Sequence, residues 1–455
     1  MINKKFMLLL GSLMLIWASC EDPYNDELNL DQLNFGESLP KTELDNWLYE
    51  NFTSPYNIEV KYRWDASETD VDYTLVPPKP EKVTEVMTLV KEAWIAPYMK
   101  IAGAGFFNSY SPKQFVLLGS AKYNPGGTIT LGTAEGGRKV VLYVVNDFDL
   151  GSREHIKHVM HTVHHEFAHI LHQNILYPSE FKLITPGDYS SSDWDEFSDA
   201  EARRMGFITN YAMASPDEDF VEMLSTMLVE GHCGYENILS AIQVRGSDGE
   251  VDEEATNKAV ENIRKKEQIV INYLKETYNI DFEDLQTEVQ ASMDQLAPPY
   301  TLLDQWGSDK AYSTVRLSPE LVNGLPDAFL AMYNEAKENL KNDTGLDLVY
   351  MELIYDSENQ ILLHLPIKDS GGTVYNALFA YKPETDENGK LTFVYQGSNG
   401  NGNFISGMVK ALTDHLENNA FVVEWYHPAN NPCAQYPGFF PEGNPEAYFF
   451  GNLHN

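Results

Sequence analysis

One histidine-rich stretch, residues 155–173, constrains the fold of this chain more than any other feature. It lies inside a longer segment, residues 153–177, that contains neither glycine nor proline, and Pro178 follows soon after. Apolar residues recur in it at the three- and four-residue spacing of one helix face, so the segment is predicted to be a helix that ends before the proline. These apolar residues are Val159, Val163, Phe167, Ile170 and Leu171.

The centre of this predicted helix has the pattern H-E-x-x-H, formed by His165, Glu166 and His169. Residues four apart lie on the same face of a helix, so both imidazoles can bind one metal ion. Two imidazoles and one carboxylate suit zinc, with a fourth position left open for water. Glu166 lies beside the pair, where it can reach that water without ligating the metal. We therefore predict one Zn²⁺ ion held by His165 and His169.

The neighbouring histidines leave an alternative open. His158, His161 and His172 fall near the same face, so the stripe as a whole would also suit loose metal binding or a solvated groove. We expect His161 and His172, one turn away on either side, to support the metal ligands or to pack beside them. The spacing excludes the metzincin pattern, which needs glycine at position 172 and histidine at position 175, where this chain has His172 and Ile175.

A third zinc ligand has to come from another segment, and residues 215–228 offer the best candidates. Ser215 and Pro216 are typical of a helix N-terminus, and an apolar stripe follows them. Glu218 and Glu222 are four apart, so one can ligate zinc while the other orients a ligating histidine. Without the upstream motif, both would be interpreted as ordinary carboxylates that interact favourably with the positive end of the helix dipole. Rival third ligands are Asp193, Asp195, Glu196 and Glu201.

Together, H-E-F-A-H at 165–169, E-D-F-V-E at 218–222 and Tyr211 resemble the gluzincin metallopeptidases of the lethal-factor type. The resemblance implies that Glu218 ligates zinc, that Glu222 supports the site and that Tyr211 stabilises the oxyanion. It also implies that Glu166 accepts a proton from the attacking water and returns it to the leaving amine. Glu166 and Tyr211 are thus the predicted catalytic residues, and Glu222 and His161 the predicted supporting ones.

The wider chain is similar to a family of lipoprotein zinc metallohydrolases associated with Sus-like, TonB-linked nutrient import across the outer membrane. The similarity spans about residues 40–295. It rests on Pro55-Tyr56-Asn57-Ile58, Tyr62-Arg63-Trp64, Ala134-Glu135-Gly136-Gly137, residues 164–173 and residues 206–222. It implies a zinc-dependent peptidase that acts on an extracellular protein, peptide or glycopeptide, alongside an outer-membrane import complex. The alternatives are a binding protein whose zinc is structural, with His161 or His172 as a fourth ligand, and a non-catalytic accessory lipoprotein.

Residues 1–20 have the pattern of a lipoprotein signal. Lys4 and Lys5 precede an apolar run, residues 6–17, that is too short to span a bilayer as a helix, and Ala18-Ser19-Cys20 ends it. We predict cleavage before Cys20 and attachment to the outer membrane through a lipid on its thiol. A plain secretory signal is the alternative, because Trp17 departs from the aliphatic residue usual there. Residues 21–40 are predicted to be an acidic tether that favours export to the cell surface.

The net charge of the chain bears on which macromolecules it can bind, and its cysteine content bears on whether it forms disulfides. The chain has 32 Lys and Arg against 68 Asp and Glu, a net charge of −36, so it would repel the phosphates of nucleic acids. Besides Cys20 it has only Cys233 and Cys433. Two cysteines so far apart in sequence do not by themselves indicate a disulfide, and we expect free, buried thiols.

Length and patterning predict two α+β domains. We place their boundary at Pro298-Pro299, with a zinc metallopeptidase-like domain at 41–297 and an accessory domain at 298–455. The first is expected to be gluzincin-like, with a small mixed sheet beside the active-site helices. Its β-branched segment from Lys139 to Val145 is either a strand at the edge of the cleft, which can bind substrate by strand addition, or a plain core strand.

The accessory domain shows hairpin patterns and no catalytic constellation. Turns at residues 357–359 and 387–389 each separate two predicted strands. A helix from Phe404 to Leu416 and a final strand from Phe421 to Tyr426 are expected to follow. Its histidines are scattered and are interpreted as structural. Trp425, Tyr436 and Phe439 either stack on sugars or pack in the core.

Overall fold

The computed structural model describes residues 40–455 except 66, 69–72, 124–128, 131 and 136–137. The predicted signal, the lipidation site Cys20 and nearly all of the predicted tether therefore lie outside the described residues, as do Gly136 and Gly137. The chain divides into two compact units, one ending at Pro55 and one running from Tyr56 to Asn455. Helices and strands are both abundant, which confirms the α+β class.

The described part of the first unit is mostly helical. Helix α2 (Glu43–Leu48) begins at a capping box, in which the Thr42 hydroxyl accepts a hydrogen bond from the Asp45 amide and the Asp45 carboxylate accepts one from the Thr42 amide. The helix continues through one π-helical turn, η1 (Tyr49–Thr53), into α3 (Ser54–Tyr56).

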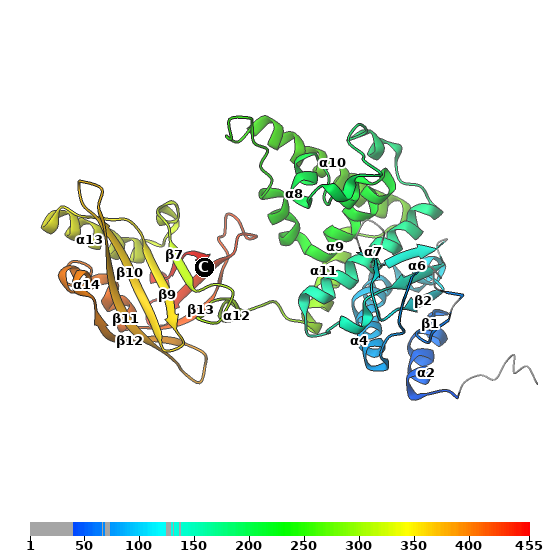
Figure 1. The fold of residues 1–455 in the computed structure, drawn as a ribbon, viewed down its shortest axis with the longest axis horizontal. Helices are drawn as coiled ribbons and strands as arrows, with labels where there is room; N and C mark the ends of the chain where they lie inside the picture. The colour runs from blue at the N-terminus through cyan, green and yellow to red at the C-terminus, as the bar shows by residue number, and fades with distance from the viewer. Residues whose placement is uncertain (1–39, 66, 69–72, 124–128, 131, 136–137) are drawn as a thin grey trace, which may run out of the picture. The chain divides into compact units, whose positions relative to one another are not determined.

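The N-terminal half of the second unit, residues 56–297, combines a small sheet with long helices (Figure 1). Its strands are β1 (Glu59–Lys61), β2 (Gln114–Leu117), β3 (Lys122–Tyr123), β4 (Ile129–Thr130), β5 (Gly132–Glu135) and β6 (Lys139–Leu142). Its longer helices are α4 (Pro80–Val90), η2 (Lys91–Ile95), α5 (Ala96–Ile101), α6 (Gly103–Tyr110), α7 (Arg153–Asn174), α8 (Asp199–Arg204), α9 (Pro216–Ser240), α10 (Glu253–Tyr278) and α11 (Phe282–Leu296). Short turns between them are η3 (Val145–Asp147), η4 (Ser179–Leu183), η5 (Trp194–Glu196) and η6 (Tyr211–Met213).

The main sheet of this half has the order β1-β2-β6-β5 and is mixed. Strands β1, β2 and β6 run parallel, and β5 runs antiparallel to β6. Of the two alternatives for residues 139–145, the structure supports the core strand and not the edge strand: β6 pairs on both sides, and residues 140–142 are buried. The two edges of this sheet are β1 and β5.

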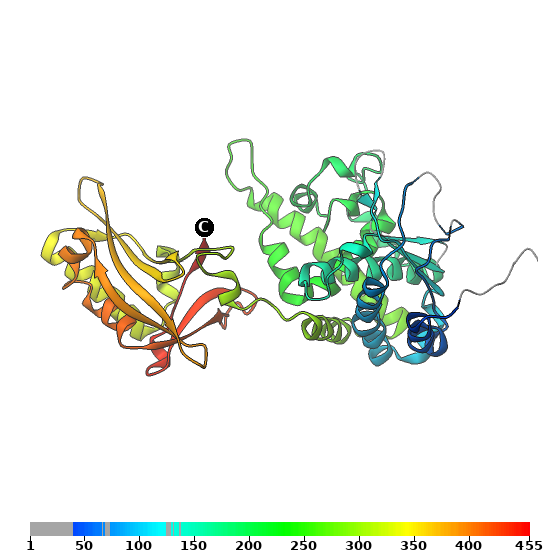
Figure 2. The ribbon, with the colours of Figure 1, turned by 60° about the horizontal axis from the view of Figure 1, so that its bottom comes forward.

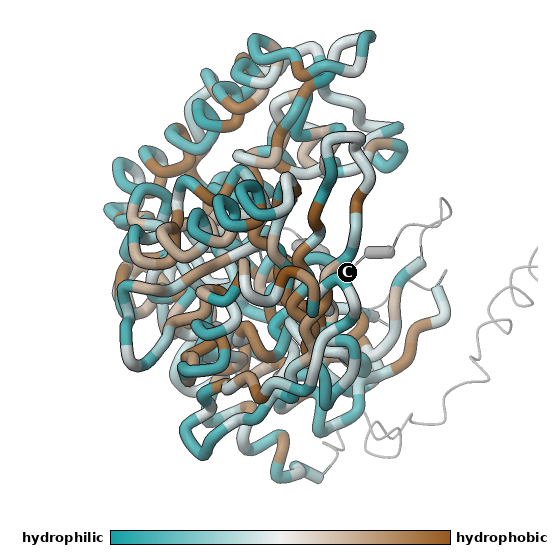
Figure 3. The backbone as a smooth tube through the Cα atoms, turned by 90° about the vertical axis from the view of Figure 1, so that its left-hand side faces the viewer, coloured by the Kyte–Doolittle hydropathy of each residue, from teal (hydrophilic) through white to brown (hydrophobic). Residues whose placement is uncertain are grey.

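Helix α7 connects this sheet to the rest of the half, since it packs against β5 and β6 and also against α9. Figure 2 shows the helices of this half from a second direction. Its apolar side meets a fully buried aromatic core. The ring of Trp94 lies edge-on to Phe107, Phe115 and Phe167, at centroid distances of 5.0, 5.8 and 5.2 Å. Hydrophilic and hydrophobic residues both occur along the helical segments in Figure 3, as expected for helices that a core covers on one face.

Helix α9 bends at Gly231, whose φ of 69° lies in the left-handed region. The bend frees backbone carbonyls, and α11 satisfies them: Gln286 donates to Met227 O at 2.6 Å and Gln290 donates to Leu228 O at 2.7 Å. A Cβ atom at residue 231 would lie 2.9 Å from the Gln290 side chain, so glycine is required both for the conformation and for the close approach.

The C-terminal half, residues 298–455, is built on a ten-stranded sheet with the order β15-β14-β13-β12-β11-β10-β9-β7-β16, to which β8 adds on β10. Its strands are β7 (Thr314–Leu317), β8 (Asp347–Leu348), β9 (Met351–Ser357), β10 (Gln360–Lys368), β11 (Val374–Thr385), β12 (Leu391–Ser398), β13 (Ala420–Tyr426), β14 (Tyr436–Pro441), β15 (Phe449–Phe450) and β16 (Asn452–His454). Its helices are α12 (Leu302–Gln305), η7 (Pro319–Gly324), α13 (Asp327–Thr344), α14 (Gly400–Ile405), α15 (Lys410–Glu417) and η8 (Pro445–Ala447). One core joins the strands to α13 and α15.

Several expectations for this half are confirmed and others are wrong. The two predicted hairpins are the antiparallel pairs β9–β10 and β11–β12. The single helix predicted from Phe404 to Leu416 is instead two helices, because Asn399 caps an earlier start and Gly407 lies in the break between them. Strand β13 is not the last strand. Phe439 is fully buried, so it packs in the core and cannot stack on sugars.

Pro298 and Pro299 lie between α11 and α12, and the domain boundary placed there stays a prediction. None of the described helices combines the length and the apolar character needed to cross a bilayer.

The expectation of two free thiols is wrong, because Cys233 and Cys433 form a disulfide across 200 residues of sequence. Cys233 follows the bend in α9, and Cys433 lies in the loop between β13 and β14. Asn237 donates a hydrogen bond to the Cys433 carbonyl at 3.2 Å. Sequence separation does not restrict which cysteines meet, and the two Cα atoms lie 4.7 Å apart.

Replacing Cys233 or Cys433 by serine is expected to lower the free energy of unfolding by about 2–4 kcal/mol, because the open chain gains conformational freedom when unfolded. The double variant is expected to lose no more than either single variant, since all three lack the same bond. Chemical denaturation with and without reductant measures this. Additive losses would show that the two sulfur atoms contribute separately.

His415 makes the C-terminal half sensitive to acid. Its ring is buried among Phe329, Phe421 and Phe449, and its Nε2 atom has no hydrogen-bond partner among the described residues. Burial lowers the pKa of His415 to about 4. The pKa of the same histidine in the unfolded chain is about 6.5. At pH values between about 4 and 6.5, the unfolded state therefore binds a proton that the folded state does not, so stability falls as the pH falls.

Acidification from pH 6.5 to pH 4 is thus expected to lower the free energy of unfolding by about 3 kcal/mol through His415, and the loss from this residue levels off below pH 4. The variant His415→Phe, which suits the surrounding rings, should lack this contribution. Urea unfolding of both proteins at several pH values gives the difference. An unchanged pH dependence in the variant would contradict the assignment.

Candidate metal centre

The two helices that carry the candidate ligands begin at serine caps. The Ser152 hydroxyl accepts a hydrogen bond from the His155 amide at the start of α7, and the Ser215 hydroxyl accepts one from the Glu218 amide at the start of α9. Helix α7 ends at Asn174, three residues before the predicted limit at Tyr177. Helix α9 starts at Pro216, as the sequence indicated.

The structure brings His165, His169 and Glu218 together. Their ligand atoms all lie within 4.8 Å of one another. Glu218 Oε2 lies 3.1 Å from His165 Nε2 and 3.2 Å from His169 Nε2. Thus the two imidazoles of α7 present their outer nitrogens to one carboxylate oxygen of α9.

This donor set fits a zinc ion. Ligand atoms at about 2.0–2.2 Å from a tetrahedral zinc are separated from one another by about 3.3–3.6 Å, close to the spacing here. Burial opposes the charge on Glu218, but the hydrogen bonds from the two imidazoles outweigh it and lower the pKa of Glu218 to about 2. Burial likewise opposes protonation of His165, yet its bonds to Glu218 and Glu222 raise its pKa to about 10. The cluster therefore stabilises positive charge at the point that a cation would take.

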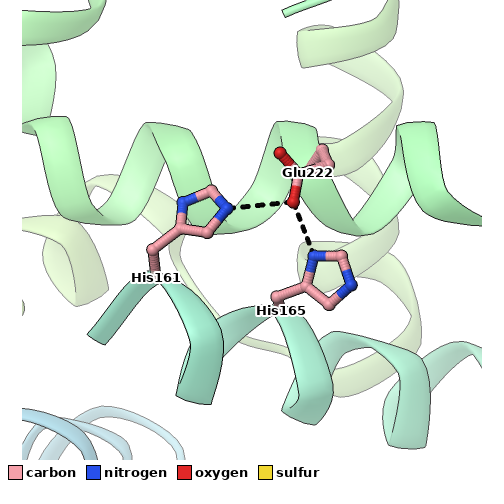
Figure 4. Close-up of side chains that lie close together, drawn as sticks. All are labelled: His161, His165 and Glu222. Carbon is pink, nitrogen blue, oxygen red and sulfur yellow. Dashed lines mark hydrogen bonds and ion pairs between the residues drawn. The ribbon is translucent and has the colours of Figure 1, made fainter. Parts of the chain in front are cut away.

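Glu222 orients His165 from behind. Its Oε1 atom lies 2.7 Å from His165 Nδ1 and 2.9 Å from His161 Nε2 (Figure 4). Its Oε2 atom accepts a hydrogen bond from the Thr209 hydroxyl at 2.6 Å. Burial opposes its charge, but these donors hold the pKa of Glu222 well below its usual range. An ionised Glu222 holds one proton of His165 on Nδ1, so the proton on Nε2 is the one that a metal would displace.

His172 plays the corresponding part for His169. Its Nε2 atom lies 3.0 Å from His169 Nδ1. Burial lowers the pKa of His172 to about 4, so its ring is neutral and can accept the His169 proton. The ring packs against Tyr177 and Phe220, at centroid distances of 5.5 and 6.1 Å. Each candidate ligand from α7 thus has a partner for its inner nitrogen.

Tyr211 lies beside the same centre. Its ring stacks on His165 at a centroid distance of 5.8 Å and meets Trp194 edge-to-face at 4.8 Å. Burial and the neighbouring carboxylates raise the pKa of Tyr211, to which a hydrogen bond with Glu218 contributes. The hydroxyl therefore stays protonated near neutral pH and can donate a hydrogen bond.

Glu166 follows His165 on α7 and is 6% exposed. Its charge lies close enough to His165 and Tyr211 to raise the pKa of both. The rival third ligands are placed elsewhere: Glu201 caps α8 through Ser198, and neither it nor Asp193, Asp195 or Glu196 joins a metal-ligating group among the described residues. Among the described residues, the histidines of the C-terminal half join no metal-ligating group either.

Behind the centre lies a buried ion pair that sequence reasoning missed. Asp219, between the two glutamates of α9, lies 2.6 Å from Lys266 of α10, and both side chains are fully buried. Tyr189 also donates to Asp219 at 2.8 Å, and Lys266 donates to the Gly206 carbonyl at 2.8 Å. Burial raises the pKa of Asp219 to about 6 and lowers that of Lys266, although the ion pair opposes both shifts. No motif marks Lys266, or Thr209, in the sequence.

A family model described as "putative zinc-binding metallo-peptidase" matches residues 37–283, which contain the whole of this centre. The chain belongs to this family. A search of curated proteins finds no match. Among solved structures, the chain is similar to a putative zinc-binding metallo-peptidase from Bacteroides caccae, with 33% identity and a TM-score of 0.46, over 56% of this chain and 92% of that one.

In this zinc-binding metallo-peptidase family member, Glu222→Gln is expected to weaken zinc binding about 10–100-fold, because an amide holds the His165 proton less firmly than a carboxylate does. Competition with a chromogenic chelator measures the affinity. Glu230→Gln, further along α9 and paired with Lys157, serves as the matched control and should bind zinc like the unaltered protein. Equal affinity of the Glu222 variant would contradict the supporting role.

Proposed function

We propose that this protein is a zinc-dependent peptidase with a gluzincin-like site. The single observation that supports the proposal most strongly is the convergence of His165, His169 and Glu218, with Glu166 and Tyr211 beside them. Zinc held by those three ligands would lower the pKa of a water molecule and polarise the carbonyl of the scissile bond.

Two side chains of the protein, Glu166 and Tyr211, carry out the remaining steps of the proposed reaction. Glu166 accepts the proton of the attacking water and later passes it to the nitrogen of the leaving amine, so no proton has to come from bulk solvent. The Tyr211 hydroxyl donates a hydrogen bond to the oxygen that becomes negative and keeps its proton. Its raised pKa keeps that proton available, and the contacts of its ring with His165 and Trp194 restrict its orientation.

The proposed location follows from the sequence. The basic start, the short apolar run and Ala18-Ser19-Cys20 support a lipid anchor, and the acidic residues after Cys20 support display at the cell surface. We propose an outer-membrane lipoprotein that cleaves extracellular proteins, peptides or glycopeptides and works with a nutrient-import complex.

The variant Glu166→Gln tests the function. It is expected to bind zinc as the wild type does and to cleave peptides about 10²–10⁴-fold more slowly, because an amide cannot accept the proton of water. Elemental analysis gives the zinc content, and mass spectrometry of a diverse peptide pool gives the cleavage rates.

Glu154→Gln, an exposed residue of the same helix, is the matched control and should retain full activity. Wild-type cleavage should stop when a chelator removes zinc. A zinc-loaded wild type that cleaves no member of the pool would instead favour an accessory lipoprotein with a structural metal. A Glu166 variant that cleaves at the wild-type rate would show that another group is the base.

A further inference from the structure

A second group of potential metal ligands lies directly behind the first. His161 Nε2, His165 Nδ1 and Glu222 Oε1 lie within 4.8 Å of one another. We propose that this group is a second, weaker position for Zn²⁺ or a similar divalent transition-metal ion, and that filling it lowers the activity of the first. The inhibitory part rests on the peptidase function proposed above.

The chemistry of the group suits such an ion. Imidazole nitrogen and carboxylate oxygen are ligands that zinc, copper and nickel share. Glu222 Oε1 lies 2.9 Å from His161 Nε2 and 2.7 Å from His165 Nδ1, and Ser225 Oγ lies 3.5 Å from His161 Nε2. Figure 4 shows both imidazoles of α7 turned toward the one carboxylate of α9. An ion between these atoms would replace the hydrogen that now joins His161 to Glu222.

The position is accessible from one side. The His161 side chain is 32% exposed, whereas those of His165 and Glu222 are 8% and 5% exposed. An ion can therefore approach His161 from solvent, and the buried carboxylate of Glu222 can then complete its coordination. Its affinity is lower than that of the first position, because only His161 and Glu222 are free of the first ion.

Binding there disturbs the first position through shared atoms. Glu222 Oε1 now accepts hydrogen bonds from both imidazoles. An ion on Oε1 withdraws that acceptor from His165, which then loses the partner that sets its orientation. If His165 Nδ1 also binds the ion, its proton leaves to solvent and the imidazole bridges the two ions. In either case the His165 ring is held differently, and catalysis slows.

Metal stoichiometry tests the proposal. Metal-free full-length protein is titrated with Co²⁺ and with Zn²⁺, followed by the visible absorbance of cobalt and by calorimetry. The wild type is expected to bind two equivalents, one tightly and one at least about tenfold more weakly. His161→Gln keeps a donor for Glu222 but is a poor ligand, so it should bind one. His158→Leu, an exposed histidine of the same helix, should bind two.

Inhibition provides the second measurement. Excess Zn²⁺ is expected to slow peptide cleavage by the wild type, and the inhibitory concentration should rise at least about tenfold in His161→Gln. A wild type that binds only one equivalent, or a His161 variant that still binds two, would overturn the second position while leaving the proposed peptidase intact. Loss of the second equivalent in His158→Leu would overturn it as well. If no equivalent binds tightly, the proposed function itself fails.

Discussion

Three acidic side chains in the first turns of α9 are withdrawn from solvent, and each has to find a partner there. An unpaired carboxylate in the protein interior is costly, so each one fixes the element that supplies its partner. Glu218 meets the outer nitrogens of His165 and His169 on α7. Glu222 meets His165 and His161 on the same helix, and Asp219 meets Lys266 on α10. These pairings fix how α7 and α10 lie against α9. Because α7 and α9 carry the metal ligands, the same pairings bring those ligands together.

The fold and the centre were predictable where the signal is local. Helical spacing, proline and serine caps gave α7 and α9, and turn residues gave the two hairpins of the C-terminal half. His165, His169 and Glu218 were singled out because metal ligands on helices obey a fixed spacing, and the structure brings them together. The roles of these residues and the domain boundary stay predictions.

What the sequence did not reveal depends on contacts between distant segments. In the sequence, Lys266 resembles any other lysine of an amphipathic helix. Only the fold shows that it forms a buried ion pair with Asp219. The partnership of Cys233 and Cys433 and the central place of β6 are likewise matters of tertiary arrangement. The interruption of the predicted 404–416 helix shows a different limit, because an apolar pattern can continue across a break that Gly407 permits.

The pairing of Asp219 with Lys266 carries a consequence for the history of this fold. The two residues lie on different helices and far apart in the chain, yet neither charge is tolerable alone in the interior. A substitution at one position creates an immediate selective disadvantage that a substitution at the other relieves. Among descendants of a common ancestor, the aspartate and the lysine are therefore expected to be inherited together or to disappear together.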